Sequence, residues 1–577
     1  MKLIFQSMGK YKAAVFLAIF IKLIGTMAEL TLPYILEYMI DHVVPAGELK
    51  SVLLWGVLMF AAAIFCRQFN VMANRRAIDN AHKVSFDVRQ ALFKKTANLS
   101  GERFDSFGLP SLISRMASDS YNVQSAVQQL QSLCVRAPMM LFGGVVMTLM
   151  MDLHLAMILI LMLPVLIFVV IFVSARGIPM YTAVQGKLDS VVRIMRENIT
   201  GIRVVKALSK AEYEKKRFAA ANEDMARSDI KAGTIMAVPA PFMQLCLNSG
   251  LTLVVFFGAV RVNEGLTQPG VILAFLTYFN MINMGVMGLS RIFMSMSKAS
   301  ASADRIQEVL NADDDWLISG QDHRDEGHIV FNEVSFSYGG EARSDADFAG
   351  GSRELALEKI SFAIGKGESL GIIGPTGCGK TTVINLLMRF YDADSGRISI
   401  DGRDVRSYEK DELRSKFGVV FQNDMIFQDS IKNNIDFGRG LSQDILDAAA
   451  EDAVAMEYIE SLEGRMEYQA AIKGANLSGG QKQRLLVARA LAGKPEILIL
   501  DDSSSALDYK TDAQMRAAIK RDHKDSTLIM IAQRVSSIMG MDHIMVLDNG
   551  RCIGYGTHEE LMENCPAYRE TYEMQTT

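Results

Sequence analysis

Apolar residues are unevenly distributed along the 577 residues of this chain. Up to about residue 300 they form long runs, whereas beyond about residue 325 they occur in the short bursts that are typical of an α/β domain. A chain of this length also suggests more than one domain. The pattern therefore predicts an apolar helical domain at residues 1–310, a linker at 311–326 and an α/β domain at 327–577.

Six of the apolar runs are long enough to cross a bilayer, which takes about 20 helical residues. They lie near residues 13–40, 51–74, 131–151, 154–175, 233–261 and 269–296. Any one run is also compatible with a buried core helix, but six in series without a polar face predict membrane spans. Charges at this depth are costly and are expected to face a cavity or a partner, or to lie near helix ends. The charged residues in or near the six runs are Lys22, Glu29, Arg67, Arg136, Arg261 and Arg291.

The charge of the connections predicts the orientation of the spans. Lys and Arg are concentrated before the first run and in the long connections at about 75–130 and 176–231, while the other three connections are short and nearly uncharged. The positive-inside rule then places both termini and both long connections in the cytoplasm of a multi-pass protein of the cell (inner or plasma) membrane. Both long connections have helical patterns, and we expect their tips, near residues 104–114 and 204–213, to touch the cytoplasmic domain.

A glycine-rich segment in the second domain carries the first candidate chemistry. Residues 374–381 read Gly-Pro-Thr-Gly-Cys-Gly-Lys-Thr and follow an apolar burst at 369–373. Glycines at this spacing turn backbone N–H groups inward onto phosphate, while Lys380 reaches the outer phosphates and the Thr381 hydroxyl ligates Mg²⁺. The predicted ATP-binding positions of this segment are Gly374, Pro375, Thr376, Gly377, Cys378, Gly379, Lys380, Thr381 and Thr382.

A second apolar strand ends in a carboxylate. Residues 497–500 are followed by Asp501, a pattern in which a buried strand delivers an aspartate to the water shell of Mg²⁺. A strand that merely ends in an aspartate looks the same, but the glycine-rich segment upstream favours the magnesium interpretation. The sequence thus predicts ATP and Mg²⁺ as ligands.

These segments, together with Leu-Ser-Gly-Gly-Gln at residues 477–481, resemble the ABC transporter family over essentially the whole chain. Residues 196–207 and 301–305 look like segments of exporter-type half-transporters. The resemblance implies a six-span α-helical transmembrane domain followed by an α/β P-loop ABC ATPase domain. It also implies that two such ATPase domains close head to tail, so that the signature residues of one chain complete the ATP site of the other. Those residues are Leu477, Ser478, Gly479, Gly480 and Gln481.

The resemblance assigns further positions. Tyr338 resembles the aromatic residue that stacks on adenine, and Gln422 resembles the glutamine that contacts Mg²⁺ and senses the membrane domain. Ser505 and Asp508, in Ser-Ala-Leu-Asp, resemble the D-loop. The implied metal-site residues are therefore Thr381, Gln422 and, through water, Asp501.

Two positions depart from the family's pattern. Asp502 stands where the family normally has the glutamate that polarises the attacking water, and Gln533 stands where it normally has a histidine. The aspartate is about 1–1.5 Å shorter, and a misplacement of about 1 Å can cost on the order of a hundredfold in rate. The glutamine amide still donates a hydrogen bond but has no titratable proton to share. Ile472 also replaces a usual glutamate ahead of the signature segment.

Two interpretations of these departures remain. Asp502 and Gln533 are either drift within a working homodimer, or marks of a degenerate catalytic site in a heterodimer with a second half-transporter. The second interpretation is favoured because the binding residues are intact and two coupled chemical groups are lost. The chain then resembles the degenerate-site subunit of heterodimeric bacterial exporters of drugs (multidrug export), lipids or peptides.

The cargo is predicted only as a class. Methionines and aromatic residues in the last two spans favour a cavity for a hydrophobic or amphipathic substrate, although ordinary lipid-facing or packing surface explains any one of them. Gln244, Asn248, Asn280, Asn283 and Arg291 are candidate cavity residues. ATP-driven export is the first hypothesis, with an ATP-gated channel or regulatory subunit, or an importer on the exporter fold, as alternatives. The spans exclude a nucleic-acid role for the ATPase domain.

Cysteine usage adds one expectation. The six cysteines show no paired spacing, which argues against disulfides and zinc sites. Cys378 lies inside the phosphate loop, and its thiol is expected to be reactive in the absence of ATP.

Residues 339–356 form a Gly- and Asp-rich insertion that we expect to be solvated.

Overall fold

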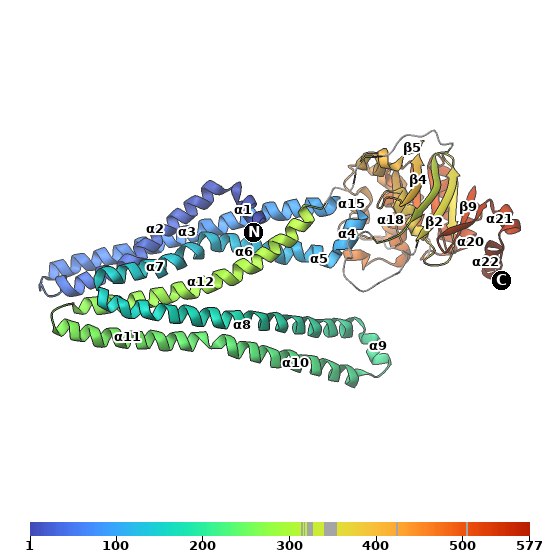
Figure 1. Cartoon of the computed structure of the whole chain (residues 1–577). Helices are drawn as coiled ribbons and strands as arrows, with labels where there is room; N and C mark the ends of the chain where they lie inside the picture. Colours follow the sequence, from blue (N-terminus) through green and yellow to red (C-terminus); the bar gives the residue numbers. More distant parts are fainter. Residues whose placement is uncertain are drawn as a thin grey trace. The chain divides into compact units, whose positions relative to one another are not determined.

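The computed structural model describes residues 1–312, 316, 318–319, 327–339, 355–422, 425–503 and 506–576. The chain divides into two compact units (Figure 1). The first consists of Met1–Ala97 and Pro110–Asn311, and the second of Asn98–Leu109 and Ala312–Thr577. Most of the predicted linker and residues 340–354 of the predicted insertion lie outside the described residues.

Helices make up the described secondary structure of the first unit (Figure 1). They are α1 (Lys2–Gly9), α2 (Lys12–Tyr38), η1 (Met39–Val43), α3 (Leu49–Asn98), α5 (Leu109–Ser114), η2 (Arg115–Asp119), α6 (Ser120–Gln131), α7 (Leu133–Met151), α8 (Leu153–Thr200), α9 (Ile202–Ala207), α10 (Ala211–Ala237), α11 (Pro239–Asn263) and α12 (Pro269–Leu310). Six helical segments are long and apolar enough to cross a membrane, as the sequence predicts.

Several helices extend well beyond the bilayer. The helix α3 has 50 residues and α8 has 48, which at about 1.5 Å per residue is more than twice the thickness of the hydrocarbon core. The long connections are therefore helical, as expected. The tip formed by α9 packs against α8 and α10 within the first unit, and its predicted contact with the ATPase domain stays a prediction.

The other tip belongs to the second unit. It contains α4 (Gly101–Phe107), where the Gly101 N–H donates to the Phe390 carbonyl at 3.1 Å. Asp105 accepts a hydrogen bond from the Tyr391 hydroxyl at 2.5 Å. A Cβ atom on residue 101 would lie 2.7 Å from the Phe390 oxygen, so glycine permits this close approach. The contact predicted for residues 104–114 is thus confirmed for residues 104–109, while residues 110–114 belong to the first unit.

The helix α12 lies at the centre of the first unit and packs against α7, α6, α2 and α11. Small residues allow it to approach α7 closely, because a Cβ atom on Gly285 would lie 2.9 Å from the Ala137 carbonyl oxygen. The buried Tyr278 hydroxyl donates to the Leu30 carbonyl at 2.7 Å and joins α12 to α2.

Four of the charged residues in the spans, Lys22, Glu29, Arg136 and Arg261, have partners that offset their cost in lipid. Lys22 is 4% exposed and donates to the side-chain oxygens of Asn70 and Asn74 at 2.8 and 3.2 Å. Arg136 pairs with Glu29 at 2.7 Å. Arg261 pairs with Asp152 at 3.1 Å.

A polar cluster joins η2 to the cytoplasmic end of α12. The buried Asp119 carboxylate accepts hydrogen bonds from the Ser302 hydroxyl and from Nε of Arg305, both at 2.8 Å. Arg115 pairs with Glu308 at 2.9 Å beside it. Since hydrogen bonds to charged groups stabilise by about 1.5–3 kcal/mol, this cluster holds the two helical segments together outside the apolar spans.

The second unit carries two sheets. Its elements are β1 (Ile329–Phe336), β2 (Leu357–Ile364), β3 (Ser369–Ile373), α13 (Lys380–Leu387), β4 (Ser395–Ile400), β5 (Arg403–Asp404), η3 (Val405–Ser407), α14 (Lys410–Ser415), β6 (Phe417–Val420), α15 (Ile431–Asp436), α16 (Gln443–Asp452), α17 (Met456–Ser461), η4 (Arg465–Glu467), η5 (Ile472–Gly474), α18 (Gly479–Ala492), β7 (Ile497–Asp501), α19 (Tyr509–Asp522), β8 (Thr527–Ile531), α20 (Val535–Ile538), β9 (His543–Asp548), β10 (Arg551–Gly556), α21 (His558–Asn564) and α22 (Pro566–Thr576).

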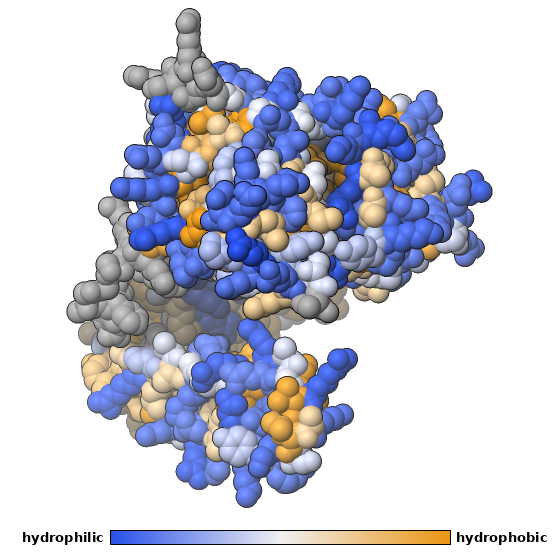
Figure 2. All heavy atoms as spheres, turned by 90° about the vertical axis from the view of Figure 1, so that its right-hand side faces the viewer, coloured by the Kyte–Doolittle hydropathy of each residue, from blue (hydrophilic) through white to orange (hydrophobic). Residues whose placement is uncertain are grey.

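The six-stranded sheet has the order β10-β9-β3-β8-β7-β6, parallel except for the pair β9 and β10. All five residues of β7 are buried, as expected for a strand covered on both faces. The smaller antiparallel sheet has the order β2-β1-β4-β5. The face of this unit around α21 and α22 is largely hydrophilic (Figure 2), which fits an ATPase domain surrounded by water.

Removing the Asp119 carboxylate should destabilise the first unit. Asp119→Ala leaves the Ser302 and Arg305 donors without their shared acceptor, at a cost of about 2–3 kcal/mol. The thermal unfolding midpoint of the protein in detergent should fall by several degrees. As a matched control, Asp79→Ala removes an exposed pair with Lys83 and should cost at most about 1 kcal/mol. Equal midpoints for the two variants would contradict a structural role for the Asp119 cluster.

Candidate functional site

The candidate site lies where the carboxyl ends of three parallel strands meet. The glycine-rich loop follows β3, Asp501 ends β7, and Gln533 follows β8. Asp501 is paired with Ile531 across the sheet, and the Asp502 N–H donates to the Ile531 carbonyl at 3.0 Å. Strand register therefore brings residues from three distant parts of the sequence to one edge, which is where α/β sheets bind ligands.

The glycine-rich loop has the backbone geometry of a phosphate cradle. Gly377 and Gly379 have φ angles of +86° and +103°, which glycine adopts without steric cost. The loop leads directly into α13, which begins at Lys380 and presents the positive end of its dipole. The Lys380 ammonium lies over the loop and donates to the carbonyls of Gly374 and Pro375 at 2.8 and 2.7 Å. This arrangement fits the outer phosphates of a nucleotide.

The residues predicted to hold Mg²⁺ lie next to this cradle. The Thr381 hydroxyl donates to the Asp501 carboxylate at 2.9 Å, and Asp501 is 2% exposed. Burial raises the pKa of the Asp501 carboxyl, and the hydrogen bond from Thr381 opposes this shift. A buried carboxylate beside a hydroxyl is a donor set that suits a hard, oxygen-seeking cation such as Mg²⁺.

Asp502 and Gln533, the two departures from the family's pattern, are in direct contact. The Gln533 amide donates to the Asp502 carboxylate at 2.9 Å. Burial raises the pKa of Asp502, while the Lys380 ammonium and hydrogen bonds from Gln533 and Gln422 lower it. Asp502 also has a φ of +52°, in the left-handed region that aspartate tolerates better than most residues. The structure thus brings together Lys380, Gln422, Asp502 and Gln533.

Tyr338 lies beside the helix that follows the phosphate loop. The residue is 46% exposed, and its hydroxyl donates to Thr382 at 3.1 Å. An exposed ring next to the loop fits a base-stacking platform. The ring also meets Tyr391 edge to face with centroids 5.3 Å apart, and Tyr391 donates to Asp105 of α4. Tyr391 therefore links Tyr338 to α4, which belongs to the long connection at about 75–130.

The signature residues form the start of a different helix. Ser478 caps α18 in a capping box, accepting from the Gln481 N–H at 3.3 Å while its own N–H donates to the Gln481 side chain at 2.8 Å. Ser478 and Gly479 are exposed at the N-terminus of this 14-residue helix. Exposed backbone donors at a helix N-terminus are suited to an anion from outside the chain.

Of the two predicted D-loop positions, the structure describes only Asp508. Ser505 lies outside the described residues. Asp508 caps α19 and accepts from the Thr511 N–H at 2.9 Å, which gives it a structural role in the helix.

Two glutamines that no sequence pattern indicated support the site. Gln575 in α22 accepts from the Val535 N–H at 2.8 Å and donates to the Gln533 carbonyl at 2.9 Å. It therefore holds the backbone on both sides of Arg534. Gln483 in α18 accepts from the Ala506 N–H at 2.9 Å and links that helix to the segment after β7. Only the fold brings these positions to the site, because they lie far from the sequence motifs or outside them.

Cys378 does not have the environment that its sequence position suggested. It is 4% exposed, and burial raises the pKa of its thiol, although the nearby Lys380 ammonium opposes the shift. Because the thiolate is the reactive form, burial and a raised pKa both slow alkylation. The structure therefore argues against the reactive thiol expected from the sequence.

The alkylation of Cys378 should accordingly be slow in the folded protein without ATP. Mass spectrometry of N-ethylmaleimide-treated protein at pH 7 should show a rate at least about tenfold below that of the denatured chain. Between pH 7 and 9 the folded-state rate should rise by about tenfold per pH unit, since the thiolate fraction grows in that proportion below the pKa. Equal rates in the folded and denatured protein would show that the thiol is accessible.

Comparison with known proteins assigns both domains of the chain to one family. A family model described as the ABC transporter transmembrane region matches residues 15–286, and one described as ABC transporter matches residues 357–505. An uncharacterised ABC transporter ATP-binding protein of Bacillus subtilis is 34% identical over 561 residues, covering 97% of this chain and 96% of that protein. An ATP-dependent lipid A-core flippase of Vibrio vulnificus is 29% identical over 570 residues, covering 98% and 96%.

A solved structure also resembles the chain as a whole. It is described as a bacterial Atm1-family ABC exporter with ATP bound, and the comparison has a TM-score of 0.80 with 98% of each chain covered. The sequence identity is 23%, so this likeness shows the fold.

Proposed function

Because the chain belongs to the ABC transporter family, as a six-span membrane domain fused to an ATPase domain, we propose that it acts as one half of a heterodimeric exporter. It is an ATP-hydrolysing multi-pass membrane protein with a cytoplasmic ATPase domain. In the proposal its own site binds ATP but hydrolyses it slowly, and its signature segment completes the competent site of the partner. The proposal rests chiefly on the pairing of Asp502 with Gln533.

ATP binding would use the groups that surround the phosphate loop. The backbone donors of residues 376–381 and Lys380 would hold the phosphates, and Tyr338 would stack on the base. Thr381, Gln422 and, through water, Asp501 would hold Mg²⁺, which when bound neutralises charge on the phosphates.

Hydrolysis needs a group that orients and polarises the attacking water. Asp502 is the nearest carboxylate at this position, but it is one methylene shorter than glutamate and is tied to the Gln533 amide at 2.9 Å. The amide donates a hydrogen bond yet holds no proton that it could transfer near neutral pH. Both features slow the chemical step while leaving the binding groups in place, which accounts for a site that binds without efficient turnover.

The cargo in this proposal is a hydrophobic or amphipathic molecule, either a drug, a lipid or a peptide. The similarity to a protein named as a lipid A-core flippase favours the lipid class. A slow site would also suit an ATP-gated channel or a regulatory subunit. Stimulation of ATP hydrolysis by candidate substrates supports a pump, whereas ionic current without turnover supports a channel; flux into inverted vesicles tests export against import.

Steady-state ATP hydrolysis by the chain alone tests the catalytic part of the proposal. We expect the purified chain in lipid to bind ATP but turn it over slowly. Asp502→Glu combined with Gln533→His should raise kcat by about tenfold to a hundredfold, with little change in KM because the binding groups are untouched. Lys380→Ala serves as the control that abolishes binding. Fast turnover by the unmodified chain, with contaminants excluded, would refute the slow-site proposal.

The asymmetry of the dimer gives a separate test. When the chain is paired with a half-transporter that carries glutamate and histidine at the two positions, Lys380→Ala in this chain should reduce transport less than the matching substitution in the partner. The reason is that the partner's site performs most of the hydrolysis in the proposal. Equal losses from the two substitutions would indicate two equivalent sites.

A further inference from the structure

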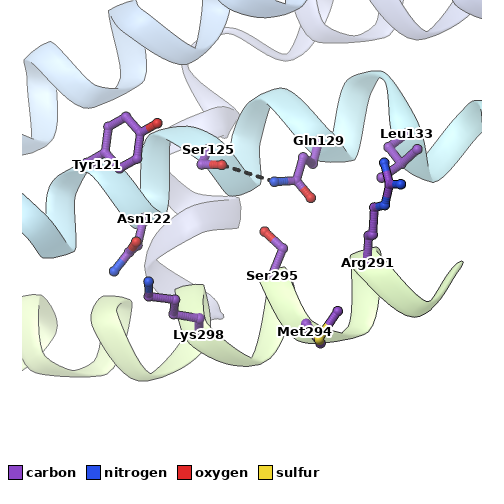
Figure 3. Close-up of a pocket in the computed structure, with 9 residues that line it drawn as sticks. All are labelled: Tyr121, Asn122, Ser125, Gln129, Leu133, Arg291, Met294, Ser295 and Lys298. Atoms are coloured by element: carbon purple, nitrogen blue, oxygen red, sulfur yellow. Dashed lines mark hydrogen bonds between the residues drawn. The ribbon is translucent and has the colours of Figure 1, made fainter. Parts of the chain in front are cut away.

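A cavity of about 470 Å³ lies between α6 and α12 in the first unit (Figure 3). The α6 wall carries Asn122, Ser125 and Gln129, and the α12 wall carries Arg291, Ser295 and Lys298. Figure 3 shows Arg291, Ser295 and Lys298 extending from α12 toward α6. The cavity is therefore lined on both sides by groups that form hydrogen bonds.

Two positive charges dominate its electrostatics. Arg291 and Lys298 are seven residues apart on one helix face, which separates them by about 10 Å along the axis. Among the described residues that line the cavity, two are cations and none is Asp or Glu. Within the part of the chain that the structure describes, neither cation forms an ion pair within 4.0 Å, and both residues are exposed.

The α6 wall is held in place by its own hydrogen bonds. The Gln129 amide donates to Ser125 at 3.0 Å. The Asn122 amide donates at 3.0 Å to Ser302, which in turn donates to the buried Asp119. Because Arg305 neutralises Asp119, the cluster behind the wall brings no net negative charge to the cavity. The two lining cations are left to attract an anion from outside the chain.

Apolar groups complete the lining. Leu133 lies at the Arg291 end, and Tyr121 lies at the Lys298 end (Figure 3). The chain continues from Leu133 into α7, one of the membrane-spanning segments. An apolar tail leaving the cavity at the Arg291 end would therefore run toward the spans, while a polar head group would remain between the cations.

The positive-inside rule alone accounts for Lys and Arg at the cytoplasmic side of a span. It does not require two cations to extend into the same cavity opposite amide and hydroxyl groups. We propose that this cavity binds the phosphate-bearing head group of an amphipathic substrate, with Arg291 and Lys298 contacting the phosphate oxygens. The inference rests on the proposed export function and specifies its substrate class.

Equilibrium binding tests the inference without relying on ATP turnover. The probe is short-chain phosphatidic acid, added to the full-length protein in a neutral detergent, with phosphatidylcholine of the same chain length as the uncharged comparison. Phosphatidic acid should bind at least about tenfold more tightly, and Arg291→Gln combined with Lys298→Gln should remove that difference. Arg291→Lys combined with Lys298→Arg should retain most of it. The tighter binding should also weaken at high salt.

A matched control separates the cavity from general positive charge. Lys216→Gln combined with Lys231→Gln removes the same charge from exposed positions on α10 and should leave phosphatidic acid binding unchanged. Thermal unfolding midpoints verify that all variants are folded. Equal binding of the two lipids, or unchanged binding after loss of Arg291 and Lys298, would overturn the inference.

Glycerol phosphate distinguishes the two sources of phosphate. Weak binding of this soluble ester, relative to phosphatidic acid, is expected for a site that takes amphiphiles. Equally tight binding would assign the cavity to soluble phosphate esters and overturn the amphiphile assignment. ATP hydrolysis measured on the same variants keeps the outcomes separate, since lipid binding is read whether or not the slow-site proposal holds.

Discussion

The convergence of the carboxyl ends of β3, β7 and β8 at one edge of a parallel sheet is the constraint on which the ATPase unit depends. It places the phosphate loop, Asp501 and the segment of Gln533 next to one another, although the loop precedes the other two by more than a hundred residues in the sequence. The hydrogen-bonded register of the sheet sets this arrangement, with Ser369 beside Leu528 and Asp501 beside Ile531. The positions of the candidate catalytic side chains follow from that register.

A low dielectric environment explains the behaviour of the acidic residues at this edge. Burial raises the pKa of Asp501 and Asp502, and each is opposed by hydrogen-bond donors or by Lys380. Bound Mg²⁺ would add the positive charge that favours the ionised form of both carboxylates. The site is thus arranged to hold a nucleotide with its cation, while Gln533 occupies the hydrogen-bonding position next to Asp502 without offering a titratable proton.

The cost of an isolated charge in lipid explains why charged residues in the first unit form ion pairs and hydrogen bonds. Lys22, Arg136 and Arg261 lie in the spans and each has a polar or acidic partner there. Beyond the spans, Asp119 is satisfied by Ser302 and Arg305. Arg291 and Lys298 line a cavity whose described walls also contain amide and hydroxyl groups and no carboxylate.

The sequence by itself determined the six spans, the phosphate loop and the identity of Asp502 and Gln533, because each depends on local composition or on a short motif with its own physical requirement. Hydrophobic length alone is enough to predict a span, and glycine spacing alone is enough to predict a phosphate loop. Only the tertiary structure decided that Cys378 is buried, that Asp508 caps a helix, and that Gln483 and Gln575 support the site. It also decided that Arg291 shares a cavity with Lys298. These facts depend on contacts between distant segments, and no local pattern carries that information.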